Sequence, residues 1–313
     1  MSIATELQDL NDNILDAYTA IGNKGGTVPA QKNTANLDTA IGSIPAAPEA
    51  YIPLELTSNG TLQKPSSVTW VAPNGATTIG DYGLSHAFHD YTGLTSVDFK
   101  NVTTISTGGL YYAFYGCTSL TSVNLSNVTS IGYNGLSNAF SQGPRFTTIN
   151  LGKVITIDNS GLYYAFENCT SLTSVDLSNL TTINNYGLGY AFTDCIHLTS
   201  VDLSNLVTVN GNAFNNAFRR CTGLTTMSFN KVSSIGTSGF VSAFRNCTNL
   251  TSLSFPALTT SSFGSYSNQF DYMLQGCSGV TVHFPAAIQS TIGNWSSVTS
   301  GFGGTNTTVL FDL

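Results

Sequence analysis

Residues 161–183 read GLYYAFENCTSLTSVDLSNLTTI, and residues 187–209 read GLGYAFTDCIHLTSVDLSNLVTV, which is the same pattern 26 positions later. Three further apolar frames, beginning at Leu94, Val97 and Ile105, have the same period. Seven copies in register do not arise by chance, so the chain contains a tandem repeat of 26 residues. The Ala-Phe pair marks the copies at Ala87-Phe88, Ala113-Phe114, Ala139-Phe140, Ala165-Phe166, Ala191-Phe192, Ala217-Phe218 and Ala243-Phe244.

Each repeat contains two kinds of periodicity. The Val-Asp-Leu segment alternates apolar and polar residues, which predicts a short strand with Val97 and Phe99 inside and Ser96 and Asp98 outside. The G-L-x-x-A-F-x-x-C segment spaces its apolar residues three or four apart, which predicts a short helix or 3₁₀ turn. One short strand and one short helix per unit, stacked so that the strands form a parallel sheet, predicts an α/β repeat solenoid.

The motif A-F-x-x-C-T-S-L-T-S-V-D-L resembles the BspA-like (Treponema-type) leucine-rich repeats of bacterial surface and phage proteins. The resemblance covers about residues 66–285 and implies a leucine-rich-repeat solenoid with a binding surface. The family unit is usually a few residues shorter, so we expect the additional Gly-Leu stretch to lengthen the helical side.

Three segments follow from where the repeat begins and ends. Residues 51–285 are predicted to form the solenoid with its N-terminal cap, residues 286–313 a C-terminal cap, and residues 1–50 a helical arm with a Pro-rich linker. After Phe255 the frame slips by four residues, so that Met273, Leu274 and Cys277 take the places of Ala, Phe and Cys.

The N-terminal arm carries a heptad pattern. Its apolar residues are spaced alternately four and three apart, which is typical of a coiled-coil seam. We therefore expect a coiled-coil-like oligomerisation or docking arm, with a homotrimer favoured; an amphipathic helix folded onto the solenoid cap is the alternative. The seam residues are Ile3, Leu7, Leu10, Ile14, Ala17 and Ile21.

The arm also resembles the N-terminal segments of tail-associated proteins from phages of gut Firmicutes. The matching residues are Ala17 to Pro29 and Asn36 to Pro45. This resemblance implies a virion component, made in the bacterial cytoplasm, that contacts other virion proteins through the arm. It would also account for the absence of a signal peptide from the N-terminal residues.

Composition excludes several function classes. Only 9% of the 313 residues are charged, and Ser, Thr, Asn and Gly take the surface role of Lys and Glu. The net charge of −7 argues against binding to nucleic acid. No apolar run approaches the roughly 20 residues needed to cross a bilayer, so membrane insertion is not expected.

The residues that could carry chemistry have simpler explanations. Five of the six cysteines share one repeat position, which favours buried free thiols over redox or metal use. His86, His89 and Asp90 form one His-x-x-His-Asp cluster, which we interpret as a surface group and not as a metal site. No Gly-x-Ser-x-Gly elbow or paired-carboxylate signature is present, so we predict neither an enzyme nor a cofactor.

Two rows of side chains are candidate binding surfaces. An outward row on the strands places polar groups at regular spacing; a solvated sheet face is the alternative interpretation. A more variable row on the predicted helical side carries tyrosines, which offer rigid amphipathic area for recognition; packing between adjacent turns is the alternative there. The strand row comprises Asp98, Asn124, Asn150, Asp176 and Asp202, and the second row comprises Tyr111, Tyr112, Tyr163, Tyr164 and Tyr190.

The leading hypothesis is a phage virion adhesin, such as a tail fibre or receptor-binding protein, whose solenoid recognises a host surface glycan or protein. The alternative is a BspA-like adhesion protein held on the bacterial cell surface. An ice-binding function is disfavoured because Asp and Asn interrupt the hydroxyl rows.

Overall fold

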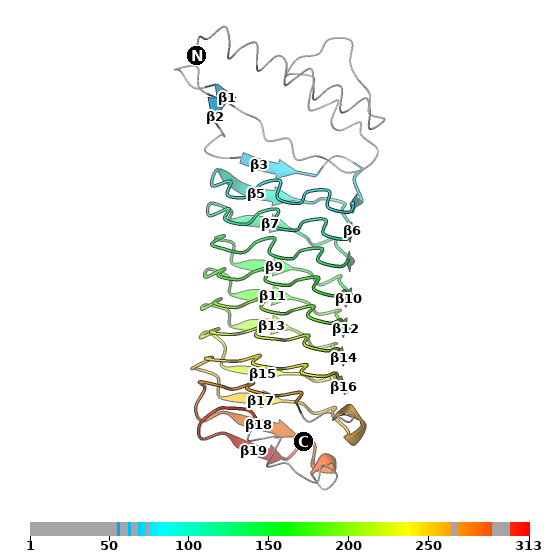
Figure 1. The fold of residues 1–313 in the computed structure, drawn as a ribbon, viewed down its shortest axis with the longest axis vertical. Coiled ribbons are helices and arrows are strands. Elements are labelled where there is room, and N and C mark those ends of the chain that lie inside the picture. The colour runs from blue at the N-terminus through cyan, green and yellow to red at the C-terminus, as the bar shows by residue number, and fades with distance from the viewer. Residues whose placement is uncertain (1–54, 57–61, 64–67, 73–74, 264–267, 290–300) are drawn as a thin grey trace.

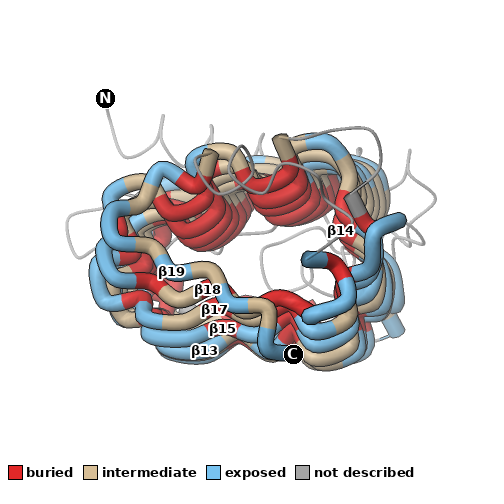
Figure 2. The backbone as a smooth tube through the Cα atoms, turned by 90° about the horizontal axis from the view of Figure 1, so that it is seen from below, coloured by how far each residue is buried: buried red, intermediate tan, exposed pale blue. Residues whose placement is uncertain are grey.

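In the computed structural model, the chain winds into coils that stack along one axis (Figure 1). The structure describes residues 55–56, 62–63, 68–72, 75–263, 268–289 and 301–313. Buried residues line the inside of every coil, and exposed residues lie on the outside (Figure 2). The arm residues Ile3, Leu7, Leu10, Ile14 and Ile21 lie outside the described residues.

One face of the stack is built from the predicted Val-Asp-Leu strands. These strands pair in parallel within three separate sheets, for example Ser174 with Ser200 and Asp176 with Asp202. Val97 and Phe99 are buried whereas Ser96 and Asp98 are partly exposed, which confirms the predicted orientation. The strands are β3 (Val68–Val71), β5 (Leu94–Asp98), β7 (Ser122–Asn124), β9 (Thr148–Asn150), β11 (Ser174–Asp176), β13 (Ser200–Asp202), β15 (Thr226–Ser228), β17 (Ser252–Ser254), β18 (Thr281–Phe284) and β19 (Thr308–Phe311).

A further parallel sheet, which the sequence did not predict, runs without a break along another side of the stack. Each coil contributes only two residues, a polar one followed by a buried Ile or Val. A strand of two residues is too short to be recognised from alternating polar and apolar residues. Its strands are β4 (Thr78–Ile79), β6 (Thr104–Ile105), β8 (Ser130–Ile131), β10 (Thr156–Ile157), β12 (Thr182–Ile183), β14 (Thr208–Val209) and β16 (Ser234–Ile235). In addition, β1 (Glu55–Leu56) pairs antiparallel with β2 (Leu62–Gln63).

The predicted helical side is not helical. In the described residues the G-L-x-x-A-F-x-x-C segments form runs of turns, in which N–H groups bond alternately within the coil and to the next coil. The Ala165 N–H donates to Leu162 O at 3.0 Å, whereas the Phe166 N–H donates to Ala191 O at 2.9 Å. The helix prediction was therefore wrong, because inward-facing residues three and four apart are shared by a helix and by these turns.

Every fourth residue of these runs has a positive φ, as at Ser160 (+54°), Tyr164 (+55°) and Asn168 (+58°). Such a backbone is compatible with a chain rich in Gly and Asn, which tolerate this conformation. The only helices among the described residues are the short 3₁₀ segments η1 (Thr260–Phe263) and η2 (Ala286–Ile288).

The core consists of columns of equivalent side chains. Rings of the repeated Phe stack from coil to coil with centroids 5.2–5.7 Å apart, from Phe88 through Phe166 to Phe244. All six cysteines are buried and free, which confirms that prediction.

Hydroxyl and amide side chains join the coils on the outside. The Thr173 hydroxyl donates to Thr147 O at 3.0 Å, and the Thr199 hydroxyl repeats this contact with Thr173 O at 3.1 Å. The side-chain amide of Asn205 donates to Ser178 O at 2.7 Å. Short polar side chains therefore satisfy carbonyl groups of the neighbouring coil, which gives a physical reason for the scarcity of charged residues.

The last coils keep the stack although their sequence departs from the repeat. The N–H of Phe244 donates to Met273 O just as Phe218 donates to Ala243 O, and Leu274 and Cys277 are buried. The substitution of Met273, Leu274 and Cys277 for the repeat residues is thus confirmed. Although residues 286–313 carry no repeat, β19 within them pairs in parallel with β18 and extends the sheet formed by β15, β17 and β18.

Candidate functional site

The strand row lies on the outside of the Val-Asp-Leu strands, over two of their sheets, and borders a shallow groove, here called the strand groove. This groove has a volume of about 630 Å³ and spans β9, β11 and β13. Of the five predicted strand-row residues, Asn150, Asp176 and Asp202 line it, together with Thr148, Ser174, Ser178 and Ser200. Asp98 and Asn124 lie on β5 and β7, outside the groove lining.

Each residue of the strand row also has a structural role. The side-chain Oδ1 accepts a hydrogen bond from the backbone N–H two residues later, and so closes the turn that ends the strand. Asp98 accepts from Lys100 at 2.8 Å, Asp176 from Ser178 at 2.9 Å, and Asp202 from Ser204 at 3.0 Å. Asn124 and Asn150 make the same contact. Because Asp and Asn serve equally well in such turns, turn formation accounts for this row without a ligand.

The tyrosines of the turn side border a second groove, here called the tyrosine groove. Its volume is about 460 Å³, within the range of roughly 300–1,000 Å³ that is common for ligand pockets. Four predicted residues line it: Tyr111 and Tyr112 on one coil, and Tyr163 and Tyr164 two coils further. The coil between them contributes only small polar groups, from Asn134, Ser137 and Asn138, and the remaining lining residues are Tyr115, Ser160 and Glu167.

The rings of this groove brace one another. Tyr111 and Tyr112 meet edge to face with centroids 4.7 Å apart, and Tyr163 and Tyr164 do so at 4.6 Å. Tyr190, the fifth predicted residue, lies behind one wall, where its ring stacks on Tyr164 at 4.5 Å. These edge-to-face and stacked contacts are favourable arrangements of aromatic rings, so the walls are held in place before any ligand arrives.

Burial changes the acidity of these phenols. Desolvation raises the pKa of Tyr112, and the neighbouring Tyr111 and Tyr115 hydroxyls add to this effect. Desolvation likewise raises the pKa of Tyr163 and of Tyr164. The three hydroxyls therefore stay protonated through the neutral range and can donate hydrogen bonds.

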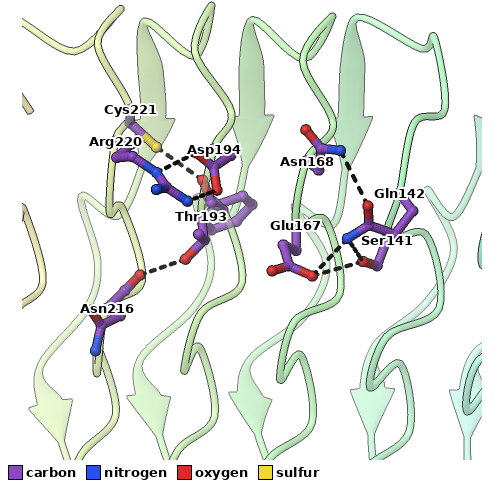
Figure 3. Close-up of polar contacts among 10 residues, drawn as sticks. Ser141, Gln142, Glu167, Asn168, Thr193, Asp194, Asn216, Arg220 and Cys221 are labelled. Carbon is purple, nitrogen blue, oxygen red and sulfur yellow. Dashed lines mark hydrogen bonds and ion pairs between the residues drawn. The ribbon is translucent and has the colours of Figure 1, made fainter. Parts of the chain in front are cut away.

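A carboxylate at the edge of the tyrosine groove was not singled out by the sequence. Glu167 accepts hydrogen bonds from the Ser141 hydroxyl and the Gln142 side-chain amide of the preceding coil, both at 3.0 Å (Figure 3). Aligning the repeats by column places Asn138 between Tyr112 and Tyr164, but only the tyrosines of that column were selected as candidates. Glu167 lies three residues after Tyr164, outside that column, and its acidic side chain among the tyrosines was the signal that could have identified it.

The His-x-x-His-Asp cluster belongs to an aromatic surface. His86 stacks on Tyr112 at 5.2 Å, and His89 stacks on Tyr115 at 4.8 Å. The His89 ring also approaches the Asp90 carboxylate at 3.0 Å. Within the described part of the chain, no three His, Cys, Asp or Glu side chains are grouped so that they could hold a metal ion. None of the described helices has the length and apolar character of a membrane span.

Comparison with known proteins identifies the repeat. The family profile described as the BspA type leucine rich repeat region matches residues 78–217, 137–275 and 215–295, and these matches together cover more than half of the chain. None of the curated protein sequences is significantly similar to the chain.

Three solved structures are similar to the chain over most of its length. The pneumococcal vaccine antigen PcpA is 13% identical, with 87% of this chain and 85% of that chain covered and a TM-score of 0.35. A leucine rich cell surface protein of Faecalibacterium prausnitzii is 16% identical, with 82% and 92% covered and a TM-score of 0.25. An internalin of Listeria monocytogenes is 10% identical, with 81% and 86% covered and a TM-score of 0.28.

Proposed function

The chain belongs to the BspA-type leucine-rich-repeat family, and we propose that it is a non-enzymatic adhesin whose solenoid binds a glycan or a protein on a cell surface. The observation that carries this proposal is the tyrosine groove, where aromatic walls, amides and hydroxyls converge on one open surface. Rigid amphipathic rings among Ser and Asn give contact area at a low entropic cost, which suits recognition.

The adhesin we propose is a phage virion protein, such as a tail fibre or receptor-binding protein. The N-terminal arm would form a homotrimer or dock onto other virion proteins through Ile3, Leu7, Leu10, Ile14 and Ile21. This part of the proposal rests on the heptad spacing and on the resemblance to phage tail-associated proteins. The alternative is an adhesion protein held on the bacterial surface.

Binding of the labelled full-length chain to a panel of gut Firmicutes cells, measured by flow cytometry, tests the adhesin. We expect saturable binding to some strains that unlabelled protein displaces. If none of the strains shows saturable binding, the proposed function is contradicted. Antibody labelling then separates the two locations, because a virion protein is found on purified particles and a cell-surface protein on uninfected cells.

Light scattering on the full-length chain tests the arm. We expect a trimeric mass, and we expect Leu7→Asp combined with Leu10→Asp to give a monomer because two charges in a coiled-coil seam oppose association. Gln8→Asp, which adds a charge outside the heptad seam, is the matched control. A monomeric mass for the unaltered chain would rule out the oligomerising arm.

A further inference from the structure

The tyrosine groove is an interruption in a column of stacked rings. Equivalent positions of five successive coils carry His86, Tyr112, Asn138, Tyr164 and Tyr190. The ring of His86 stacks on Tyr112, and the ring of Tyr164 stacks on Tyr190. Asn138 has no ring, so the column is broken for one coil, and Asn138 lies in the groove there.

We propose that the slot between Tyr112 and Tyr164 binds one pyranose ring, the terminal sugar of a surface glycan, in the place of the missing ring. This inference rests on the proposed adhesin function and names the class of its ligand.

The spacing of the column fits a saturated ring. The stacked pairs have centroids 5.2 Å apart at His86 and Tyr112, and 4.5 Å apart at Tyr164 and Tyr190, close to the spacing of about 4.8 Å between neighbouring strands. Two coils therefore separate the walls by about 9.6 Å. A ring midway between them lies about 4.8 Å from each wall, a distance at which the C–H groups on the two faces of a pyranose ring can pack against the faces of both tyrosine rings.

The polar groups of the groove suit a ligand that carries hydroxyls. Ser137 and Asn138 line it on the intervening coil, and the Asn138 side-chain amide donates to the Ser137 hydroxyl at 3.1 Å. Glu167 adds carboxylate oxygens that can accept a hydrogen bond from a sugar hydroxyl. The protonated phenols add hydrogen-bond donors. A sugar hydroxyl in the slot can therefore donate to one protein group and accept from another.

The backbone conformation at the walls is that of the repeat. Tyr112 and Tyr164 have φ of +53° and +55°, and Asn138 adopts the same conformation between them at +56°. Because other coils share this positive φ, the residue type and not the backbone distinguishes the slot: two rings flank one short amide side chain.

The closed stacks on both sides limit the slot to one sugar unit. On one side the ring of Tyr112 stacks on His86, so the column is filled there. Beyond Tyr164 the stack closes again on Tyr190, so no second ring can follow along the axis. The slot therefore selects a terminal or branching sugar over the interior of an extended chain.

Saturation-transfer NMR on the full-length chain tests this proposal directly. The probes are the methyl pyranosides of glucose, galactose, mannose, rhamnose, N-acetylglucosamine and N-acetylgalactosamine. We expect at least one of them to bind, with saturation reaching its ring C–H protons. Asn138→Tyr should weaken that binding by at least about tenfold, because the added ring completes the column and fills the slot.

Asn216→Tyr is the matched control. Asn216 holds the same repeat position with φ +52°, outside the lining of the tyrosine groove, so this variant should bind as the unaltered chain does. Thermal melts of both variants check that the added tyrosine is tolerated. The proposal is overturned if none of the six glycosides binds, or if Asn138→Tyr binds them as well as Asn216→Tyr does.

Cell binding by the same three proteins separates this inference from the proposed function. If Asn138→Tyr still binds cells, the proposed adhesin function is supported and the proposed sugar site is contradicted. If the chain binds a glycoside but no cell, the sugar site is supported and the adhesin function is contradicted. A third outcome would show that the slot takes a protein side chain and that the sugar assignment is wrong. In that case Asn138→Tyr does not bind cells, protease treatment of the cells abolishes binding of the unaltered chain, and the glycosides do not compete with it.

Discussion

Cys195 donates its thiol hydrogen to the carbonyl oxygen of Phe166 on the preceding coil, with 3.1 Å between sulfur and oxygen. Equivalent contacts join Cys221 to Phe192 and Cys247 to Phe218. The thiol thus fills core space and adds a second hydrogen bond to a carbonyl that already accepts the backbone N–H of Cys169 at 3.1 Å. A reactive role is disfavoured, because burial raises the pKa of these thiols and the thiolate is the nucleophilic form.

The raised thiol pKa values predict a loss of stability at alkaline pH. Burial raises the pKa of Cys277 from 9.0 to about 11. Between these values the unfolded chain releases a proton that the folded chain keeps, so the free energy of unfolding falls as pH rises. Each such thiol contributes at most about 1.4 kcal/mol per pH unit. Urea unfolding under reducing conditions from pH 7.5 to pH 10.5 measures the slope.

Cys277→Ala is the control for this pH dependence. It removes one titrating thiol, so its unfolding free energy should fall less steeply above pH 9 than that of the unaltered chain. A stability that rises across this range, or an identical slope for the variant, would contradict the linkage to Cys277.

Truncating one ring of the Phe column should destabilise the whole solenoid. Phe166 is fully buried, and its ring stacks on Phe140 at 5.7 Å and on Phe192 at 5.6 Å. Phe166→Ala leaves a cavity between coils, and we expect a loss of about 3–5 kcal/mol, against a smaller loss for Phe166→Leu. Chemical denaturation measures the free energy of unfolding of both variants. Equal losses would show that the stability of the column does not depend on how much of the cavity the side chain fills.

Relieving backbone strain outside the tyrosine groove should stabilise the protein. Tyr272 has φ +56° and is 55% exposed, and the equivalent positions of other coils carry Asn138 and Asn216. We expect Tyr272→Asn to raise the free energy of unfolding by roughly 1 kcal/mol, because Asn tolerates this conformation. Tyr133 is 48% exposed and is not among the residues with positive φ, so Tyr133→Asn should change stability little. An equal gain from both variants would show that removing an exposed ring, and not backbone strain, is responsible.

The sequence was sufficient for the repeat, the orientation of Val97 and Asp98, and the replacement of Ala, Phe and Cys by Met273, Leu274 and Cys277. It was misleading where two structures share a pattern: Leu162, Ala165 and Phe166 point inward from a run of turns as they would from a helix. What separates the two is the sign of φ at residues such as Tyr164, and nothing in the residue type of a tyrosine predicts a positive value.

The candidate sites were predicted unevenly for a similar reason. Reading along the chain found the tyrosines but not the groove, because the groove is defined by the absence of a ring at Asn138 between two coils that carry one. Reading the strand row found regular polar groups but not their hydrogen bonds to the backbone, since alternation says which side chains face outward and not what they contact.

Two substitutions at Asp176 distinguish a structural role of the strand row from a binding role. Its Oδ1 accepts the Ser178 N–H at 2.9 Å, and Asn150 makes the same contact with Gly152 at 3.0 Å on the preceding coil. Asp176→Asn should therefore keep the turn and the stability of the protein. Asp176→Ala leaves the N–H without this acceptor, so we expect a loss of about 1 kcal/mol in urea unfolding.

The same two variants report on the strand groove. If the Asp176 carboxylate contacts a ligand, Asp176→Asn removes its charge and weakens cell binding although stability is unchanged. If the row only closes turns, Asp176→Asn binds cells as the unaltered chain does. We expect the second result, because Asn already stands at positions 124 and 150 of the same row and closes the turn there as Asp does at 176.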